Sequence, residues 1–220
     1  RTGSPALAVI KVNGNFPNNR LHHDLPRIQG FVPLLDADRG CVLALMDSIE
    51  ITARRTAAAT ALAAKYLAQR DSRTLGMIGC GVQALCHVEA LRDVVPIDTV
   101  MFCDPRDEAA DAFGAHMRKL DLSARRVGDA NTAARDADIV VTVTTSTRPL
   151  LGLGDIDPGT FVAGVGADNP AKHELHVDLI KASRLIVDSV AQASTMGDLH
   201  HAIAAGAMQA TDVHCALADL

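Results

Sequence analysis

Short apolar runs alternate with longer stretches of mixed polarity along most of the chain. After residue 74 this pattern predicts strands at 75–78, 100–103, 139–143, 161–165 and 185–187, with amphipathic helices between them. Strands separated by helices need crossover connections, which produce a mostly parallel sheet. The pattern therefore predicts an α/β fold with a Rossmann-type, doubly wound sheet.

The first seventy residues follow a different pattern. Asn-Gly and Pro-Asn-Asn turns around Lys11 predict an irregular, polar stretch. Apolar runs at 31–35 and 41–46 flank a five-residue loop that contains glycine, which is typical of a β-hairpin. Asp47 and Glu50 have the spacing of a capping box and predict the start of an alanine-rich helix to about residue 69.

Composition indicates a folded protein and argues against some classes of binding partner. Of 220 residues, 48% are hydrophobic and 21% are charged, which provides enough apolar surface for a sizeable core. The net charge of −5 argues against a nucleic-acid-binding protein or one that binds an anionic membrane. No apolar run reaches the roughly 18 residues of a membrane helix. Five scattered cysteines without Cys-x-x-Cys spacing favour reduced thiols and a cytoplasmic location.

A glycine-rich turn follows the strand predicted at 75–78. Residues 79–84 read Gly-Cys-Gly-Val-Gln-Ala, the alanine-ending form of the dinucleotide fingerprint. Gly79 permits a tight turn, Gly81 lets a pyrophosphate approach the backbone, and the following helix N-terminus attracts its negative charge. Asp104 ends the next predicted strand, where an acid would accept hydrogen bonds from the ribose hydroxyls.

The expected cofactor is NAD rather than NADP, because Asp104 would repel a 2′-phosphate. Arg106, two residues further on, would soften that preference. The structural alternative is a glycine turn that serves strand–helix packing alone, followed by an ordinary aspartate at a strand end.

Further blocks of sequence, taken together and in order, carry a resemblance to a known family. They are Lys11–Pro17, Ile28–Gly30, Arg55–Ala58, Gly79–Gln83, Gly166–Leu175 and Gly197–Leu199. These blocks resemble the ornithine cyclodeaminase/mu-crystallin family, over essentially the whole chain. The resemblance implies NAD(P)-linked redox chemistry at the α-carbon of a small amino acid or a cyclic imine. It also implies a homodimer where the full first domain is present.

The resemblance assigns roles to individual residues. Lys11 matches the lysine that holds the substrate carboxylate, Arg55 an arginine that touches substrate and nucleotide, and Asp168 the acid/base residue. We therefore expect Asp168 and Lys11 to be catalytic, and Lys11 and Arg55 to bind the substrate. The residues expected to contact the dinucleotide are Arg55, Gly79, Gly81, Val82, Gln83, Asp104, Thr144, Val165 and Lys172. The chemistry is consistent, since a free amino acid needs cations for its carboxylate and amine oxidation needs a proton acceptor.

Several of these residues also have an explanation that involves no function. Lys11 is also explained as a solvated loop lysine, and Asp168, before Asn169-Pro170, as a turn former. Cys80 stands at a helix N-terminus, where a thiol pKa tends to fall, but a small packing side chain explains it as well. His173 and His176 have no accompanying third ligand, so no metal is expected.

The sequence departs from the family pattern at two informative places. Arg27 replaces a threonine that faces the cofactor in the family, and such a cation would suit a phosphate or an acidic substrate. Ala171 replaces the usual glycine of Pro-Gly-Lys, which would strain the loop if φ were positive there.

The domain organisation follows from these motifs. We expect residues 1–69 to form part of a mixed α/β domain for substrate binding and dimerisation, with its connecting helix. Residues 70–198 are expected to form an NAD(P)-binding Rossmann domain, and residues 199–220 to begin a return segment to the first domain. Compared with the family pattern, the chain is expected to be clipped at both ends.

Three reaction outcomes remain open from sequence. An amino acid dehydrogenase releases an oxo acid and ammonia, and a ketimine reductase runs toward the amine. A cyclodeaminase of the ornithine type is formally a lyase, because it returns the hydride and loses ammonia. A different possibility is a crystallin-like protein that binds a nucleotide or another ligand without turnover.

Overall fold

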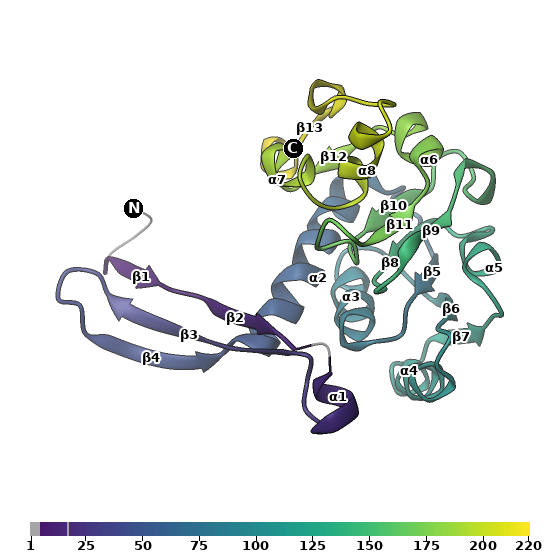
Figure 1. Ribbon diagram of the computed structural model, residues 1–220. Coiled ribbons are helices and arrows are strands. Elements are labelled where there is room, and N and C mark those ends of the chain that lie inside the picture. Colours follow the sequence, from purple (N-terminus) through teal and green to yellow (C-terminus); the bar gives the residue numbers. More distant parts are fainter. Residues whose placement is uncertain (1–4, 17) are drawn as a thin grey trace. The chain divides into compact units, whose positions relative to one another are not determined.

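The computed structural model describes residues 5–16 and 18–220, which form two compact units (Figure 1). Unit 1 extends to residue 56 and unit 2 comprises residues 57–220; helix α2 (Ser48–Leu67) contributes to both. Pro17, the last residue of the Lys11–Pro17 block, lies outside the described residues. The division into 1–69, 70–198 and 199–220 stays a prediction about domains.

Unit 1 is built on a four-stranded antiparallel sheet. The long strand β3 pairs with the three others; the bounds are β1 (Leu7–Val9), β2 (Val12–Asn15), β3 (Ile28–Asp36) and β4 (Val42–Asp47). The predicted hairpin is confirmed as β3–β4. Its turn is held by the Asp36 carboxylate, which accepts hydrogen bonds from the backbone of Asp38 and Arg39 and pairs with the Arg39 side chain.

The expectation of an irregular stretch around Lys11 is wrong for residues 12–15, which form β2. Asn13 and Gly14 are paired with Gly30 and Gln29 of β3. Backbone pairing with the long β3 outweighs the turn preference of the Asn-Gly-Asn sequence. A short helix, α1 (Asn19–His22), follows β2.

The N-terminus of α2 is capped differently from the predicted capping box. The Asp47 carboxylate accepts a hydrogen bond from the backbone N–H of Ile49 at 2.6 Å. Glu50 does not reach back toward Asp47 in this way, since its carboxylate pairs with Arg54 one turn along the helix. The predicted helix is confirmed, and Asp47 caps it without the reciprocal bond from Glu50.

Unit 2 contains a five-stranded parallel sheet, which confirms the predicted Rossmann-type α/β fold (Figure 1). The strand order is β10-β8-β5-β6-β7, with bounds β5 (Thr74–Ile78), β6 (Thr99–Cys103), β7 (Ser123–Arg126), β8 (Ile139–Thr142) and β10 (Phe161–Gly164). The chain winds from β5 out to β7 and then returns to β8 on the other side of β5. The point where strand order reverses therefore lies between β5 and β8, where such sheets bind ligands.

Helices cover both faces of this sheet. The core on one face joins the end of α2 to α3 (Val82–Arg92) and α4 (Asp107–Lys119), with Leu75 and Met77 of β5 between them. The other core joins α5 (Ala130–Ala134), α6 (Val177–Ala182) and α8 (Asp198–Ala204), with Ile78 and Val140. Alternate residues of each strand point to opposite faces, so both faces of β5 are buried.

Two small strand pairs lie outside the five-stranded sheet. β9 (Thr147–Leu151) runs parallel to β11 (His173–Leu175), and β12 (Ile186–Val187) pairs with β13 (Cys215–Ala216). The segment 185–187 thus forms a strand as predicted, but it does not continue the main sheet. A short helix, α7 (Val190–Ala193), follows β12. Among the described residues, no helix combines the length and apolar character that a membrane crossing requires.

Close packing of α5 on β5 depends on Gly76. A Cβ at this position would lie 2.4 Å from the carbonyl oxygen of Ala133, so Gly76→Ala must push α5 away from the sheet. We expect the free energy of unfolding to fall by about 1–3 kcal/mol. Gly154→Ala is the matched control, because no atom lies within 4 Å of its Cβ position. Urea unfolding measures both variants, and equal stabilities would contradict this packing.

Candidate active site

The predicted site residues of unit 2 gather at one edge of the parallel sheet. Ile78, the last residue of β5, is in register with Cys103 of β6 and with Thr142 of β8. Thr142 is in turn in register with Gly164 of β10. The residues that follow these strands, among them Gly79, Asp104, Thr144 and Val165, therefore leave the sheet at its carboxyl edge. Open α/β sheets bind ligands at this edge.

The glycine turn has the backbone that the fingerprint predicts. Gly79 has a φ of +92°, and a Cβ there would lie 3.0 Å from the Val143 carbonyl oxygen, so both strain and space demand glycine. Gly81 is the N-cap of α3 and has no atom within 4 Å of its Cβ position. Within the described part of the chain, no side-chain hydrogen bond caps the helix at Gly81. The first N–H groups of α3 thus face a space that a side chain on Gly81 would fill.

Gln83, in the first turn of α3, supports the fit of a dinucleotide. Its Oε1 atom is buried and has no hydrogen-bond partner within residues 5–16 and 18–220. A buried acceptor without a partner is costly, so such atoms usually meet a ligand or ordered water. Together with the open space at Gly81, this atom fits a bound NAD at the start of α3.

Asp104 follows β6 and is held against the glycine turn. Its carboxylate accepts a hydrogen bond from the backbone N–H of Cys80 at 2.9 Å and pairs with Arg106 at 3.0 Å. Burial acts to raise the pKa of Asp104, but the hydrogen bonds from Arg106 and Cys80 outweigh it and hold that pKa below its usual value. A negatively charged acceptor is therefore fixed beside the glycine turn.

Cys80 has a packing role. Its side chain belongs to the core under α3, and burial first, then the nearby Asp104 charge, raise the pKa of the thiol to about 12. The helix N-terminus does not make this cysteine reactive, because desolvation of the thiolate is the larger effect.

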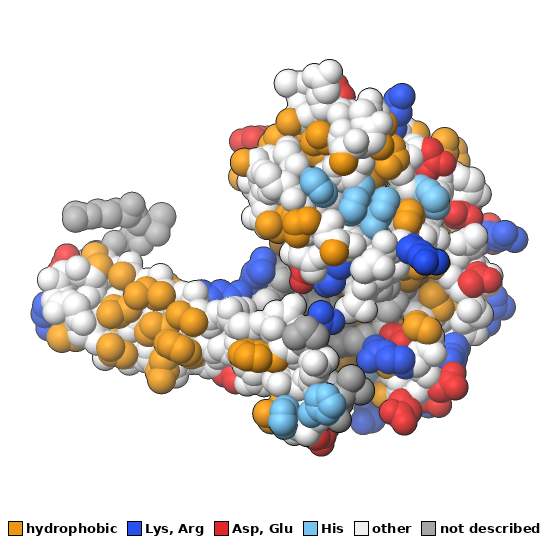
Figure 2. All heavy atoms as spheres, viewed as in Figure 1, with side chains coloured by type: hydrophobic (Ala, Val, Ile, Leu, Met, Phe, Trp, Pro, Cys, Tyr) orange, Lys and Arg blue, Asp and Glu red, His pale blue; other side chains and the backbone are white. Residues whose placement is uncertain are grey.

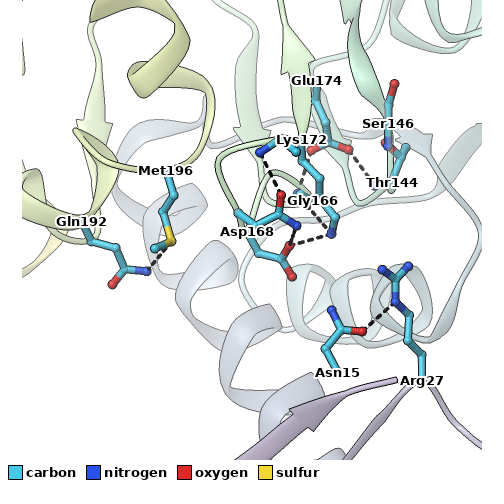
Figure 3. Close-up of polar contacts among 12 residues, drawn as sticks. Asn15, Arg27, Thr144, Ser146, Gly166, Asp168, Lys172, Glu174, Gln192 and Met196 are labelled. Atoms are coloured by element: carbon cyan, nitrogen blue, oxygen red, sulfur yellow. Dashed lines mark hydrogen bonds and ion pairs between the residues drawn. The ribbon is translucent and has the colours of Figure 1, made fainter. Parts of the chain in front are cut away.

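Asp168 and Lys172 form an ion pair in the loop between β10 and β11. Lys172 Nζ lies 2.6 Å from Asp168 Oδ1 and donates a hydrogen bond to the Gly166 carbonyl oxygen at 3.0 Å (Figure 3). The Lys172 side chain is almost buried, whereas that of Asp168 is 61% exposed. Asp168 is therefore held in place and still open to a ligand. Ala171 lies outside the positive-φ region, so the missing glycine causes no strain there.

Glu174, in β11, is a buried acid that the sequence motifs do not single out, although it lies within the Gly166–Leu175 block. Its carboxylate accepts hydrogen bonds from Thr142 Oγ1, from the Thr144 N–H and from the Gly166 N–H (Figure 3). Thr144 thus uses its N–H for Glu174, while its Oγ1 accepts from the Ser146 N–H. The surrounding sequence, Lys-His-Glu-Leu-His, is polar and gives no signal of burial, and the three partners of Glu174 lie 8 to 32 residues away.

Unit 1 carries the two predicted carboxylate-binding residues. Lys11 precedes β2 and Arg55 lies on α2, and Asn13 Nδ2 donates to Thr52 Oγ1 between these elements at 3.3 Å. Partial burial, and then the positive charge of Arg55, lower the pKa of Lys11. Neither cation pairs with a carboxylate among the described residues. Two neighbouring cations without such a partner are typical of an anion-binding site.

Arg27 also belongs to unit 1, next to β2. Its Nε donates a hydrogen bond to Asn15 Oδ1 at 2.9 Å (Figure 3). In the part of the chain that the structure describes, no carboxylate lies within ion-pair distance of Arg27. Asn15 therefore orients the guanidinium without neutralising it, and the charge is available to an anion.

His173, His200 and His201 pack against one another. The rings of His173 and His201 are stacked with centroids 4.0 Å apart, and His201 Nε2 hydrogen-bonds the carbonyl oxygen of Lys172. Burial and the neighbouring His201 lower the pKa of His173. Within the described ranges, no group of three His, Cys, Asp or Glu side chains is arranged to hold a metal ion.

Comparison with known proteins gives matches over nearly all of this chain. The profile of the ornithine cyclodeaminase/mu-crystallin family matches residues 2–219. The iminosuccinate reductase of Paracoccus denitrificans is 35% identical over 210 residues, which are 96% of this chain and 65% of the relative. An archaeal alanine dehydrogenase dimer with bound NAD has a TM-score of 0.91 at 35% identity, over 97% of this chain and 66% of that one.

A third relative was solved with an amino acid bound. The Δ1-pyrroline-2-carboxylate reductase of Thermococcus litoralis, in complex with NADH and L-proline, has a TM-score of 0.92 at 32% identity. The match covers 96% of this chain and 66% of that one. The chain thus spans just under two thirds of the length of each of these three relatives.

The electrostatic link between Lys11 and Arg55 is directly testable. We expect Arg55→Gln to raise the pKa of Lys11 toward its ordinary value of 10.5, because removing a nearby positive charge favours the charged ammonium. NMR titration of ¹³C-labelled lysine side chains measures this pKa. Arg54→Gln is the control, since the Arg54 guanidinium pairs with Glu50. An unchanged Lys11 pKa in Arg55→Gln would show that the two cations are not close.

Proposed function

The chain belongs to the ornithine cyclodeaminase/mu-crystallin family, and from this premise we propose that it acts as an NAD-dependent oxidoreductase at the α-carbon of a small amino acid or its imine. The observation that carries the proposal is an accessible carboxylate, Asp168, held by Lys172 in the loop that follows β10. This loop leaves the same sheet edge as the glycine turn, where the fold family binds its nucleotide.

The residues of unit 2 supply what a dinucleotide requires. The open N–H groups at Gly81 and the start of α3 suit the pyrophosphate. Asp104 stands where the fold places an acid for the ribose hydroxyls, and the exposed Arg106 side chain would have to give up its hydrogen bonds to the Asp104 carboxylate to admit them. Bound NAD would supply the hydride acceptor of the oxidation, or in its reduced form the hydride donor. Because Asp104 is already charged and held in place, NAD is favoured over NADP. Relatives solved with NAD or NADH support the same choice.

Lys11 and Arg55 are assigned to the substrate carboxylate. Each cation lacks a carboxylate partner in the described chain, and the lowered pKa of Lys11 reflects partial burial and repulsion by Arg55. An anionic ligand would relieve this repulsion, since opposite charges nearby favour the ammonium form. A free α-carboxylate has the charge and size for such a place.

Asp168 is assigned to proton transfer. Oxidation of an amine to an imine removes a hydride from the α-carbon and a proton from the nitrogen, and a carboxylate takes that proton. In the reverse direction the same group returns it. The pair with Lys172 keeps the carboxylate in one place, while its exposure leaves the outer oxygen to the substrate.

A specific observation favours an acidic substrate as a second candidate. Arg27 is oriented by Asn15 and has no carboxylate partner among the described residues. An imino acid with a second carboxylate would supply one, and one relative is named an iminosuccinate reductase. The cyclodeaminase outcome and a crystallin-like binding role are also open to a member of this family.

Dimer formation is part of the proposal. One relative is an alanine dehydrogenase dimer. The sheet of unit 1 exposes several large apolar side chains, including Leu7, Val9, Val42 and Leu45, and Figure 2 shows hydrophobic side chains gathered there. Exposed apolar surface of this kind marks interaction sites.

The proposed function is tested by mixing the protein with NAD⁺ and a panel of neutral and acidic L-amino acids, and with NADH and cyclic or acidic imines. Absorbance of the reduced cofactor follows both directions. Product analysis with ornithine and lysine tests the cyclodeaminase outcome, because its net reaction consumes no cofactor. Binding of NADH without any turnover would favour the crystallin-like role and contradict the oxidoreductase.

Asp168→Asn separates binding from chemistry. We expect this variant to bind NADH like the wild type but to lose turnover by roughly 10²–10⁴-fold, because the amide cannot take the proton. Asp178→Asn, an exposed acid on α6, is the control and should retain turnover. Measured kcat values decide, and an unchanged kcat in Asp168→Asn would remove this residue from the mechanism.

A further inference from the structure

Glu174 is fully buried, and its side-chain partners come from the end of β8, from the residues that follow β8 and from the loop after β10. One oxygen, Oε1, accepts from the Thr144 N–H at 2.6 Å. The other, Oε2, accepts from Thr142 Oγ1 at 2.8 Å and from the Gly166 N–H at 2.7 Å. The side chain therefore ties the end of β8 to the loop after β10, with its own strand β11 as the third element.

The charge on Glu174 is matched by these partners. Burial raises the pKa of Glu174, and the hydrogen bonds from Thr144 and Thr142 act against that rise. Both backbone partners can only donate, so each needs an acceptor oxygen. A glutamine in the same place would present its NH₂ to one of them, whichever way the amide is turned. With the NH₂ turned toward Thr144, the Thr144 N–H would lose its acceptor. With the NH₂ turned toward Gly166, the Gly166 N–H would lose its shorter bond and keep the Thr142 carbonyl oxygen at 3.1 Å.

Gly166 connects Glu174 with the Asp168–Lys172 ion pair through hydrogen bonds. Its N–H is held by Glu174, and its carbonyl oxygen accepts from Lys172 Nζ and from the Asp168 N–H. The fit is tight, because a Cβ on Gly166 would lie 2.4 Å from Glu174 Oε1 and 2.5 Å from the Thr144 carbonyl oxygen. A small displacement of Gly166 would therefore move both members of the Asp168–Lys172 pair.

The backbone of Glu174 is held in turn by helix α8. Asp198, at the start of α8, accepts hydrogen bonds from the backbone N–H groups of Glu174 at 2.8 Å and Leu175 at 3.1 Å. His201 of the same helix hydrogen-bonds the Lys172 carbonyl oxygen. Helix α8 thus fixes β11, and β11 presents Glu174 to the loop.

We propose that Glu174 is a positioning residue for the reaction: through Gly166 it sets the place of Asp168 and Lys172, without touching substrate or cofactor. The inference rests on the proposed function for the role of Asp168. Its structural half, that Glu174 holds the 166–172 loop, stands on the hydrogen bonds alone.

The test compares Glu174→Gln with Asp138→Asn. The Asp138 carboxylate also accepts two backbone hydrogen bonds, from Arg73 and Thr74, but at the amino ends of β5 and β8. Both variants make the same change from carboxylate to amide at opposite edges of one sheet. Amide NMR spectra report the loop, and steady-state kinetics report kcat and KM.

In Glu174→Gln we expect the amide signals of Gly166, Asp168 and Lys172 to shift and kcat to fall at least roughly tenfold, with a smaller change in KM. In Asp138→Asn we expect shifts near Arg73 and Thr74 and an unchanged kcat. Should Glu174→Gln fail to fold, Glu174→Asp tests the same contacts, because it keeps the charge but withdraws the carboxylate by one methylene group, and it should give a similar loss of kcat.

Unchanged loop signals or an unchanged kcat in a folded Glu174→Gln protein would overturn the inference. An equal loss of kcat in Asp138→Asn would also overturn it, because general destabilisation would then explain both. If the wild type turns over no amino acid or imine, the proposed function fails. The loop signals then still decide whether Glu174 holds the loop.

Discussion

The parallel pairing of β5 with β6 and β8 is the constraint on which the candidate site of unit 2 depends. It fixes the register of three strand ends and so brings residues 79, 104 and 144 to one edge, although they are far apart in sequence. A one-residue slip of β5 would bring a larger side chain under α5 in place of Gly76, where only glycine fits, and this opposes a change of register. Helix α3 then starts at this edge because Gly79 and Gly81 allow the chain to turn there.

Three carboxylates hold the backbone around this sheet edge by accepting hydrogen bonds from backbone N–H groups. Asp104 fixes the glycine turn, Glu174 the loop of Asp168, and Asp198 the strand that carries Glu174. Each is removed from water, and each is matched by donors that offset part of the cost of burying the charge. Asp168 differs from them, because it is mostly exposed and has one cation partner. That contrast separates the carboxylates that hold the backbone from the exposed carboxylate to which we assign proton transfer.

Much of the fold could be predicted from sequence, because apolar periodicity and turn residues are local signals. The β3–β4 hairpin, the four apolar strands of the parallel sheet and the glycine turn all follow from such signals. β7 was missed because Ser-Ala-Arg-Arg is an exposed edge strand without an apolar pattern. β12 was assigned to the wrong sheet, since two residues of pattern do not specify a partner.

The candidate site shows the same difference between residues with a local sequence signal and residues that depend on distant contacts. Motif residues such as Gly79 and Asp104 were found because their spacing is fixed by one βαβ unit. Glu174 is not found in this way, because its importance lies in contacts between distant segments. Gln83 belongs to the motif residues, and the structure adds that its Oε1 is buried without a partner among the described residues. The assignments of Lys11, Arg55 and Asp168 rest on resemblance, to which the structure adds a lowered Lys11 pKa and an accessible Asp168.

The most direct measurement of the central claim is the NADH affinity of Gly81→Val, followed by fluorescence titration. No atom of the described residues lies within 4 Å of the Gly81 Cβ position, so we expect the variant to fold with a loss of about 1 kcal/mol for the poorer N-cap, while its side chain fills the space assigned to the pyrophosphate. We predict binding by the wild type and a loss of affinity of at least roughly tenfold in the variant, the equivalent of about 1.4 kcal/mol. Equal affinity in the two proteins, or no binding by the wild type, would contradict the assignment of this turn to the dinucleotide.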